Sequence, residues 1–165
     1  MSPEHVRHKP PSRLVRPRKL VLACPTFKSN VNLSRIVRLA GCAGVEKIVA
    51  AGNARIDPRI ARDGASAVVI EQRRSLTPVL KKLRNEGYRL VGLEQTDQSH
   101  SLFDFSFARE TVLVIGHERL GITDDQLALM DDVIEIPVFG LPFSYNVVTA
   151  TTMAVYEYCK QFPEG

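Results

Sequence analysis

The chain has 165 residues, of which 44% are hydrophobic and 24% are charged, so it can build one globular core and has neither a disordered nor a fibrous composition. The formal net charge of +4 is unevenly distributed. Residues 1–19 hold six Lys/Arg against one acidic residue, residues 20–89 hold thirteen against five, and residues 90–165 hold three against twelve. A basic front and an acidic back favour a polyanion-binding surface on one side of the molecule and a different task on the other.

Residues 1–18 are predicted to form a basic, flexible arm, because they are rich in proline and cations and offer a core very little. Residues 19–165 are predicted to form one domain, in which short apolar runs alternate with longer segments of helical period. The expected strands, typical of strands buried on both faces, are Leu20–Cys24, Lys47–Ala51, Ala67–Glu71, Arg89–Leu93, Thr111–Ile115 and Val133–Ile136. The expected helices are Asn32–Ala43, Thr77–Asn85, Asp124–Met130 and Asn146–Phe162. This alternation predicts an α/β domain with a mainly parallel sheet.

Several compartments and cofactors are excluded at this level. The apolar runs are far shorter than the roughly 20 residues of a membrane-spanning helix, and prolines interrupt the basic N-terminus where a secretory signal needs its apolar stretch. Three cysteines without C-x-x-C spacing or a histidine cluster indicate neither a disulfide framework nor a metal site. We therefore expect a cytoplasmic protein that binds no metal.

The loops after the strands lack the common nucleotide-binding motifs. No strand is followed by G-x-G-x-x-G, so a dinucleotide fold is not indicated. Residues 116–123 have the glycine spacing of a phosphate-binding loop, but Ile122 stands where the lysine is needed, which argues against an NTPase. No carboxylate pair or nucleophile elbow stands out, and we expect the strand-end His117 to be a spectator.

Three segments are unusually polar for their place. Residues 30–40 form a strand-to-helix turn, in which Asn30 or Asn32 is a candidate helix cap and Arg35 and Arg38 lie opposite the apolar stripe. Residues 113–121 are a buried strand that ends in a glycine and the carboxylate of Glu118. Residues 136–147 are a strand, a Gly/Pro loop and a helix start with polar side chains.

These segments resemble, in order and spacing, the three motifs of the SpoU family, the TrmH-like branch of the SPOUT methyltransferases. The first motif is matched by Asn32, Arg38 and Ala40, with Ser34 in place of the family's glycine. The second is matched by Gly116, Glu118 and Gly121. The third is matched by Ile136, Pro137, Gly140, Ser144 and Asn146, with Tyr145 in place of leucine. The resemblance spans residues 19–162.

The resemblance implies a C-terminal deep trefoil knot, a homodimer and S-adenosylmethionine as the methyl donor. It implies methyl transfer to a ribose 2′-hydroxyl of tRNA or rRNA. The cofactor would lie against Gly116, Ile136, Ser144, Tyr145 and the strand end near Glu94.

The chemistry of such a transfer agrees with the motif residues. A ribose hydroxyl is a poor nucleophile, so the catalyst must orient it and stabilise the charge that develops on its oxygen. The guanidinium of Arg38 is the candidate for that task, through electrostatic activation rather than proton abstraction. Asn32 would orient the substrate or Arg38, Glu118 would hold this cluster, and Ser144 with Asn146 would line the cofactor loop.

Each of these residues also has a plain structural interpretation. Asn32 and Ser144 can be helix caps, Arg38 a solvated helix cation and Glu118 a surface residue. RNA would be bound mainly through its phosphates, by the arm and by basic residues of the first half of the chain: Lys28, Arg35, Arg55, Arg59, Arg62, Arg73 and Arg74. Two alternatives stay open: a SPOUT enzyme that methylates a base nitrogen, and a non-catalytic RNA-binding member of the fold.

Overall fold

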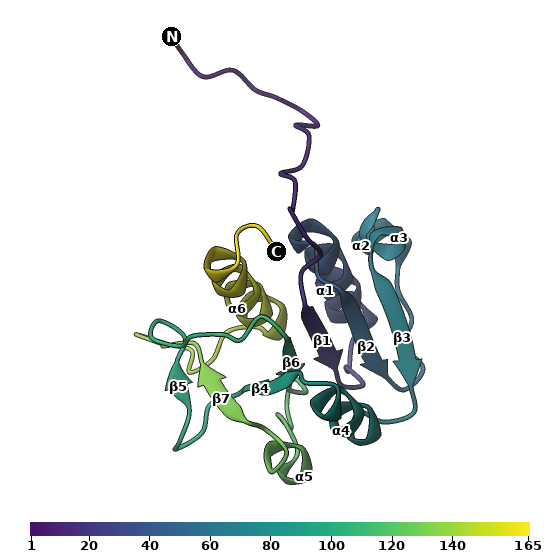
Figure 1. Cartoon of the computed structure of the whole chain (residues 1–165), viewed down its shortest axis with the longest axis vertical. Helices are drawn as coiled ribbons and strands as arrows, with labels where there is room; N and C mark the ends of the chain where they lie inside the picture. Colours follow the sequence, from purple (N-terminus) through teal and green to yellow (C-terminus); the bar gives the residue numbers. More distant parts are fainter.

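The centre of the sheet is β1 (Leu20–Cys24), all five residues of which are buried. The computed structural model, which describes residues 1–165, places β1 between two parallel partners, β2 (Lys47–Ala51) and β6 (Thr111–Ile115). Beyond β2 lies β3 (Val69–Arg73); beyond β6 follow β4 (Arg89–Leu93), β7 (Asp132–Glu135) and β5 (His100–Ser101). The order is β3-β2-β1-β6-β4-β7-β5, and every pairing is parallel, which confirms the predicted α/β class (Figure 1).

Helices cover both faces of this sheet. One face packs against α1 (Asn30–Ala43) and α6 (Val147–Gln161), with the short helices α2 (Pro58–Ala61) and α3 (Gly64–Ala67) beside α1. The other face packs against α4 (Thr77–Asn85) and the residues around α5 (Asp124–Leu127). Along β1 the side chains alternate between the two cores, which is why its sequence is apolar throughout.

The predicted strand at the β3 edge of the sheet differs from the structure in its bounds and in its burial. The strand expected at Ala67–Glu71 begins at Val69, and Ala67 belongs to α3. The cause is tertiary: α3 begins at Gly64, where an added Cβ would lie 2.8 Å from the Val37 carbonyl oxygen, so helix packing takes residues that an apolar pattern assigns to the strand. β3 is also an edge strand and is largely exposed, not buried on both faces.

The predicted helix Asp124–Met130 ends earlier, at Leu127. After it, the N–H groups of Leu129 and Met130 donate to carbonyls three residues back, at 2.9 and 3.0 Å, so the chain tightens into turns. Asp131 then donates its N–H to Leu90 O at 2.8 Å and leads into β7, which starts one residue before the expected Val133.

Ser29 caps α1, rather than Asn30 or Asn32. Its side chain accepts a hydrogen bond from the Val31 N–H at 3.1 Å. The capping interpretation of Asn32 was therefore wrong, and its side chain is available for another contact.

Residues 1–13 are exposed and extend away from the body (Figure 1), whereas the chain just before β1 is attached to it. The N–H groups of Val15 and Arg16 donate to Glu164 O at 2.9 and 3.2 Å. Arg18 is 7% exposed and donates to Phe162 O. No helix in the structure is both long and apolar enough to cross a membrane.

Candidate active site

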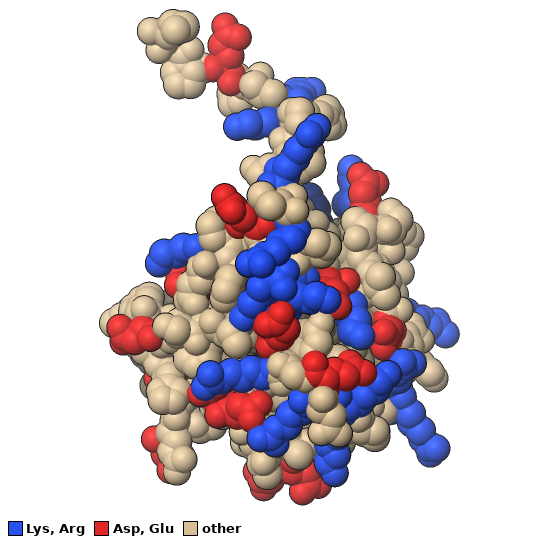
Figure 2. Space-filling model, viewed as in Figure 1, with Lys and Arg blue, Asp and Glu red and all other residues tan.

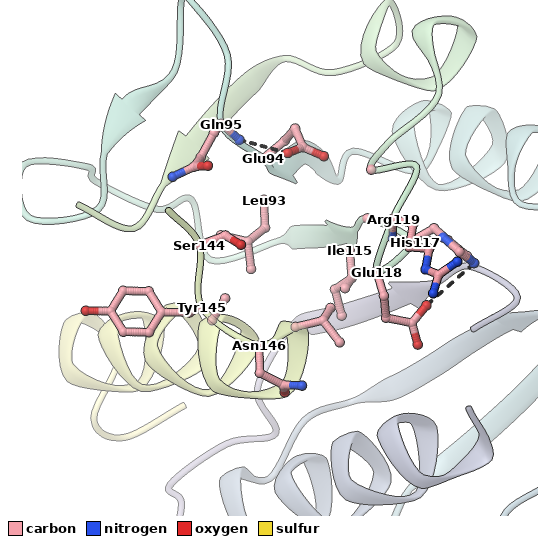
Figure 3. A pocket seen from close by; sticks show the side chains of 14 residues that line it. Leu93, Glu94, Gln95, Ile115, His117, Glu118, Arg119, Ser144, Tyr145 and Asn146 are labelled. Carbon is pink, nitrogen blue, oxygen red and sulfur yellow. Dashed lines mark hydrogen bonds and ion pairs between the residues drawn. The ribbon is translucent and has the colours of Figure 1, made fainter. Parts of the chain in front are cut away.

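A pocket of about 470 Å³ opens at the carboxyl edge of the sheet. Its walls come from three segments: residues 93–95 after β4, residues 115–121 after β6, and residues 144–150, which lead into α6 (Figure 3). In an open parallel sheet this edge is where ligands bind, because loops there diverge and leave room. The volume lies within the range of about 300–1,000 Å³ found for small-molecule sites.

Glu94 follows β4 and fastens the pocket wall. One carboxylate oxygen accepts the Ile122 N–H at 3.0 Å, and the other accepts the Gln95 N–H at 3.0 Å. A Cβ at Gly121, whose φ is +66°, would lie 2.4 Å from the Glu94 carboxylate, and a Cβ at Gly116 would lie 3.1 Å from it. The two glycines therefore let this carboxylate approach the backbone, which explains their spacing without a phosphate-binding role.

The loop between these glycines is closed on itself. The His117 N–H donates to Gly121 O at 3.0 Å, and the Gly121 N–H donates to His117 O at 2.9 Å. The His117 Nδ1 accepts the N–H groups of Arg119 and Leu120 at 3.1 and 3.3 Å. His117, expected to be a spectator, thus shapes the turn that presents Glu118.

Glu118 joins the loop to α1. Its Oε1 accepts the side-chain amide of Asn32 at 2.9 Å, and its Oε2 accepts the Lys28 N–H at 3.2 Å, with His117 Nε2 3.6 Å away. Partial burial opposes ionisation, but the hydrogen bonds from Asn32 and from backbone N–H groups, with His117 nearby, hold the pKa of Glu118 below its ordinary value. Glu118 is therefore a fixed carboxylate near neutral pH.

The third wall is the turn into α6. Asn146 caps this helix, since its Oδ1 accepts the Val148 N–H at 2.9 Å. Gln95 donates from its side chain to Phe143 O at 3.2 Å and so holds the loop next to the β4 end. Figure 3 shows Tyr145 on the side of the pocket opposite His117 and Glu118.

The structure brings most of the predicted site residues together. Those that line the pocket are Glu94, Gly116, Glu118, Ser144, Tyr145 and Asn146. Asn32 reaches it through Glu118. Arg38 and Ile136 do not line it: Arg38 is exposed on α1, about 9 Å along the helix axis from Asn32, and Ile136 is partly buried against the core.

Sequence reasoning missed other residues of the pocket wall. They are Leu93, Gln95, Ile115, Arg119, Val147 and Ala150. Leu93 and Gln95 flank Glu94, so their position at a strand end was a usable signal. Arg119 had no comparable signal, because a cation in a loop is usually solvated.

The lining suits a ligand with an apolar part and a positive charge. Leu93, Ile115 and Val147 offer apolar surface, and Glu94 and Glu118 place two carboxylates on the wall. Gly116 exposes backbone where a side chain would intrude. A nucleoside that carries a sulfonium cation, as S-adenosylmethionine does, fits this set of groups.

Fold, pocket and motif residues define one class of protein: the chain belongs to the SpoU rRNA Methylase family, whose profile matches residues 19–156. The tRNA (guanosine(18)-2′-O)-methyltransferase of Escherichia coli K12 is 29% identical over 133 residues, which are 79% of this chain and 58% of the relative. This chain thus matches little more than half the length of that enzyme.

Solved structures agree with the family. The Aquifex aeolicus TrmH/SpoU tRNA modifying enzyme superposes with a TM-score of 0.85 and 27% identity, covering 92% of this chain and 79% of that one. The SpoU methyltransferase AviRb from Streptomyces viridochromogenes, in complex with AdoMet, superposes with a TM-score of 0.78 and 27% identity. The match covers 92% of this chain and 63% of that one.

Proposed function

We propose that the chain transfers a methyl group from S-adenosylmethionine to a ribose 2′-hydroxyl of tRNA or rRNA. The observation that carries this proposal is the hydrogen bond between Asn32 and Glu118. It joins the first motif to a pocket that the second and third motifs build, so three segments far apart in the sequence meet at one place. The names of the relatives support both the reaction and the RNA substrate.

Several residues would hold the cofactor in the pocket. When bound, S-adenosylmethionine supplies an electrophilic methyl group on a positively charged sulfur. Gly116 and Ser144 would contact it along the loops, Tyr145 would cover one side, and the carboxylate of Glu94 would face its positive charge across the wall it fastens. Ile136 would act from behind, by supporting the loop that leads to Ser144.

The acceptor side belongs to α1. Asn32 is held by Glu118 and so has a fixed orientation at the rim of the pocket. Arg38 is exposed and forms no ion pair, so its guanidinium is free to bind an RNA phosphate and to stabilise the oxygen that attacks the methyl group. Asn146 keeps the start of α6, and with it Ser144, in place.

One experiment tests the reaction. The protein is mixed with S-adenosylmethionine labelled in the methyl group and with unfractionated RNA, which is then digested to nucleosides. We expect the label in a 2′-O-methyl nucleoside. Label on a base nitrogen would move the protein to another SPOUT branch, and cofactor binding without transfer to any RNA would indicate a non-catalytic RNA-binding member.

A homodimer is proposed from the surface next to the pocket. Phe139, Leu141 and Phe143 are 85%, 79% and 81% exposed, and Phe103 stacks on Phe139 at 6.4 Å between ring centroids. Apolar side chains gathered in this way are typical of a protein interface. Light scattering after size exclusion would give twice the mass of the chain, and a monomer at micromolar concentration would contradict the proposal.

A trefoil knot is proposed for the C-terminal third. The resemblance to SPOUT proteins supports it, as does the position of β7 between β4 and β5, with Gln95 holding the returning loop at Phe143. We propose the cytoplasm as the compartment, which agrees with three unpaired thiols.

Residues 1–18 are proposed to be an RNA-binding arm, on the strength of their cations and exposure. Because Val15, Arg16 and Arg18 bond to residues 162–165, a clean test removes only residues 2–13. We expect weaker RNA binding with a smaller salt dependence. An unchanged salt slope would show that the arm makes no phosphate contact.

A further inference from the structure

Three basic residues on the α4 side of the sheet are paired with acidic residues, whereas Lys81 on α4 is exposed and unpaired. Arg84 lies 2.6 Å from Asp131, Arg89 pairs with Asp132, and the Lys82 ammonium lies 3.7 Å from Glu86. Figure 2 shows basic and acidic side chains alternating over the body, with further basic side chains along the arm. A polyanion gains little from such cations, because each already has a counter-charge.

The basic residues around α1 and α2 differ. Arg35 and Arg38 on α1, Arg55 in the loop after β2 and Arg62 at the end of α2 are all exposed, and none has an acidic partner within 4.0 Å. We call these four residues the α1–α2 cationic surface. Arg59, between two of them, is paired with Asp57 at 2.8 Å and is not part of it.

Two contacts fasten the α2–α3 segment to α1. The Ser34 hydroxyl, which is fully buried, donates to Asn30 O at 2.7 Å and accepts the Asp57 N–H at 2.8 Å, just where α2 begins. Further along, a Cβ at Gly41 would lie 2.8 Å from Gly64 Cα, so the two backbones touch. Arg55 and Arg62 are therefore carried by a segment that is fixed relative to α1.

Arg62 lies two residues before a close approach of this segment to Arg38, and its backbone conformation is unusual. A Cβ added at Gly64, two residues after Arg62, would lie 2.9 Å from Arg38 Cα, which brings the segment against the candidate catalytic residue. Arg62 has φ +53° and ψ −143°, a region that residues with a Cβ rarely adopt. Backbone strain of this kind is concentrated at functional sites.

We propose that the α1–α2 cationic surface binds consecutive phosphates of the RNA that carries the methyl acceptor, with Arg55 and Arg62 holding the strand that Arg38 acts on. This inference rests on the proposed function and deepens it, since it assigns the course of the substrate to one face. Phosphate contacts of this kind fix the position of an RNA without reading its sequence.

The test compares variants that remove the same charge from opposite faces. Arg55→Ala with Arg62→Ala removes two cations from the α1–α2 cationic surface. Lys81→Ala with Lys82→Ala removes two exposed cations from α4 on the other face and is the matched control. Binding of unfractionated tRNA is measured by fluorescence anisotropy over a series of KCl concentrations, and cofactor binding by calorimetry verifies that each variant is folded.

We expect the arginine variant to weaken tRNA binding on the order of tenfold and to reduce the salt slope by roughly 1.4–1.8, because each lost phosphate contact contributes about 0.7–0.9. The control should keep the wild-type slope. Equal losses in both variants would mean that net charge alone matters, and no loss in the arginine variant would mean that RNA lies elsewhere; either result overturns the proposal.

The proposed reaction is judged separately, by labelled methyl transfer with the wild-type protein. Methyl transfer to ribose together with equal salt slopes in the two variants would contradict the proposed RNA surface and support the proposed activity. A difference in salt slopes without any methyl transfer would contradict the proposed activity and support the proposed RNA surface.

Discussion

Asn32 and Glu118 lie 86 residues apart in the chain, and a 2.9 Å hydrogen bond joins the side-chain amide of one to the carboxylate of the other. The bond connects the first turn of α1 with the loop after β6, and both lie at the carboxyl edge of the sheet. Because Glu118 also accepts the Lys28 N–H, it fixes the loop after β1 as well. One carboxylate on the pocket wall thus holds the start of α1 and the loop after β1 in place.

Replacing Asn32 by alanine should raise the pKa of Glu118. The amide is the main group that favours the ionised form, so its loss leaves burial opposed only by the backbone N–H groups and His117. The 13C shift of the Glu118 carboxyl, followed against pH, measures the change. On acidification, the rate of methyl transfer should begin to fall at a higher pH than in the wild type. Asn30→Ala is the control, since Asn30 is exposed and its side chain has no hydrogen-bond partner in the structure. An unchanged Glu118 titration would show that the bond does not form in solution.

The same linkage has a consequence for stability. A carboxyl with a lowered pKa stabilises the fold above its unfolded pKa, and this contribution is lost as the pH falls through the folded value. Asn32→Ala should therefore lose less stability than the wild type on acidification below about pH 4. Urea unfolding at neutral and acidic pH gives the difference.

Replacing Arg38 by alanine should reduce turnover by about 10²–10³-fold while leaving cofactor affinity unchanged, because removal of one charge-stabilising donor has that effect. Single-turnover kinetics and calorimetry measure the two quantities. Arg35→Ala, three residues earlier on α1, should instead raise the apparent KM for RNA with little change in kcat. A parallel loss of cofactor affinity in Arg38→Ala would assign Arg38 to the fold or to the cofactor site.

Four buried strands and the helix α4 could be predicted closely from the sequence, whereas α1 begins two residues before the expected Asn32 and α6 is one residue shorter at each end than expected. The bounds of β1, β2, β4, β6 and α4 agree with the expectation residue for residue, because each apolar run is interrupted sharply by polar residues, Gly or Pro. The shift of β3 has a different origin. The close approach of Gly41 and Gly64 is a contact between distant segments, and no local pattern contains it.

The candidate site was predictable in its members but not in its arrangement. Glu118 lies just after a strand and Asn146 at the start of a helix, and sequence periodicity predicts both of these positions. Their meeting with Asn32 depends on the order of strands in the sheet, which periodicity does not determine. Arg38 illustrates the limit, since the motif names it but the structure leaves it outside the pocket wall.

Ser34, which stands where the family motif has glycine, should stabilise this chain. Its buried hydroxyl bridges Asn30 and Asp57, so Ser34→Ala leaves the Asp57 N–H unpaired and should cost about 1–2 kcal/mol of unfolding free energy. Ser34→Gly should cost about 1 kcal/mol more, because glycine is poor inside a helix. Urea unfolding measures both. Ser75→Ala, at an exposed position whose side chain makes no hydrogen bond, should change stability by less than about 0.5 kcal/mol. A Ser34→Ala variant as stable as this control would show that the bridge contributes nothing.

The three cysteines should differ sharply in reactivity. Burial raises the pKa of the Cys24 thiol to about 12, and it also raises the pKa of Cys159, whereas Cys42 is exposed on α1. Since the thiolate is the reactive form, iodoacetamide at neutral pH should modify Cys42 first and Cys24 only after unfolding. Peptide mass spectrometry after timed labelling measures the order. Labelling of Cys24 in the folded protein would mean that β1 opens readily.

Two substitutions of Arg62 should have different effects on stability but the same effect on tRNA binding. Its positive φ costs about 1–3 kcal/mol for a residue with a Cβ, and glycine removes that strain at an entropic cost of roughly 0.5–1 kcal/mol. Arg62→Gly should therefore be more stable to urea than Arg62→Ala, which keeps the strain. Both variants lose the same guanidinium, so both should bind tRNA equally weakly. A glycine variant less stable than the alanine variant would show that Arg62 is not strained, and equal binding with altered stability would confirm that the charge, rather than the backbone conformation, contacts the RNA.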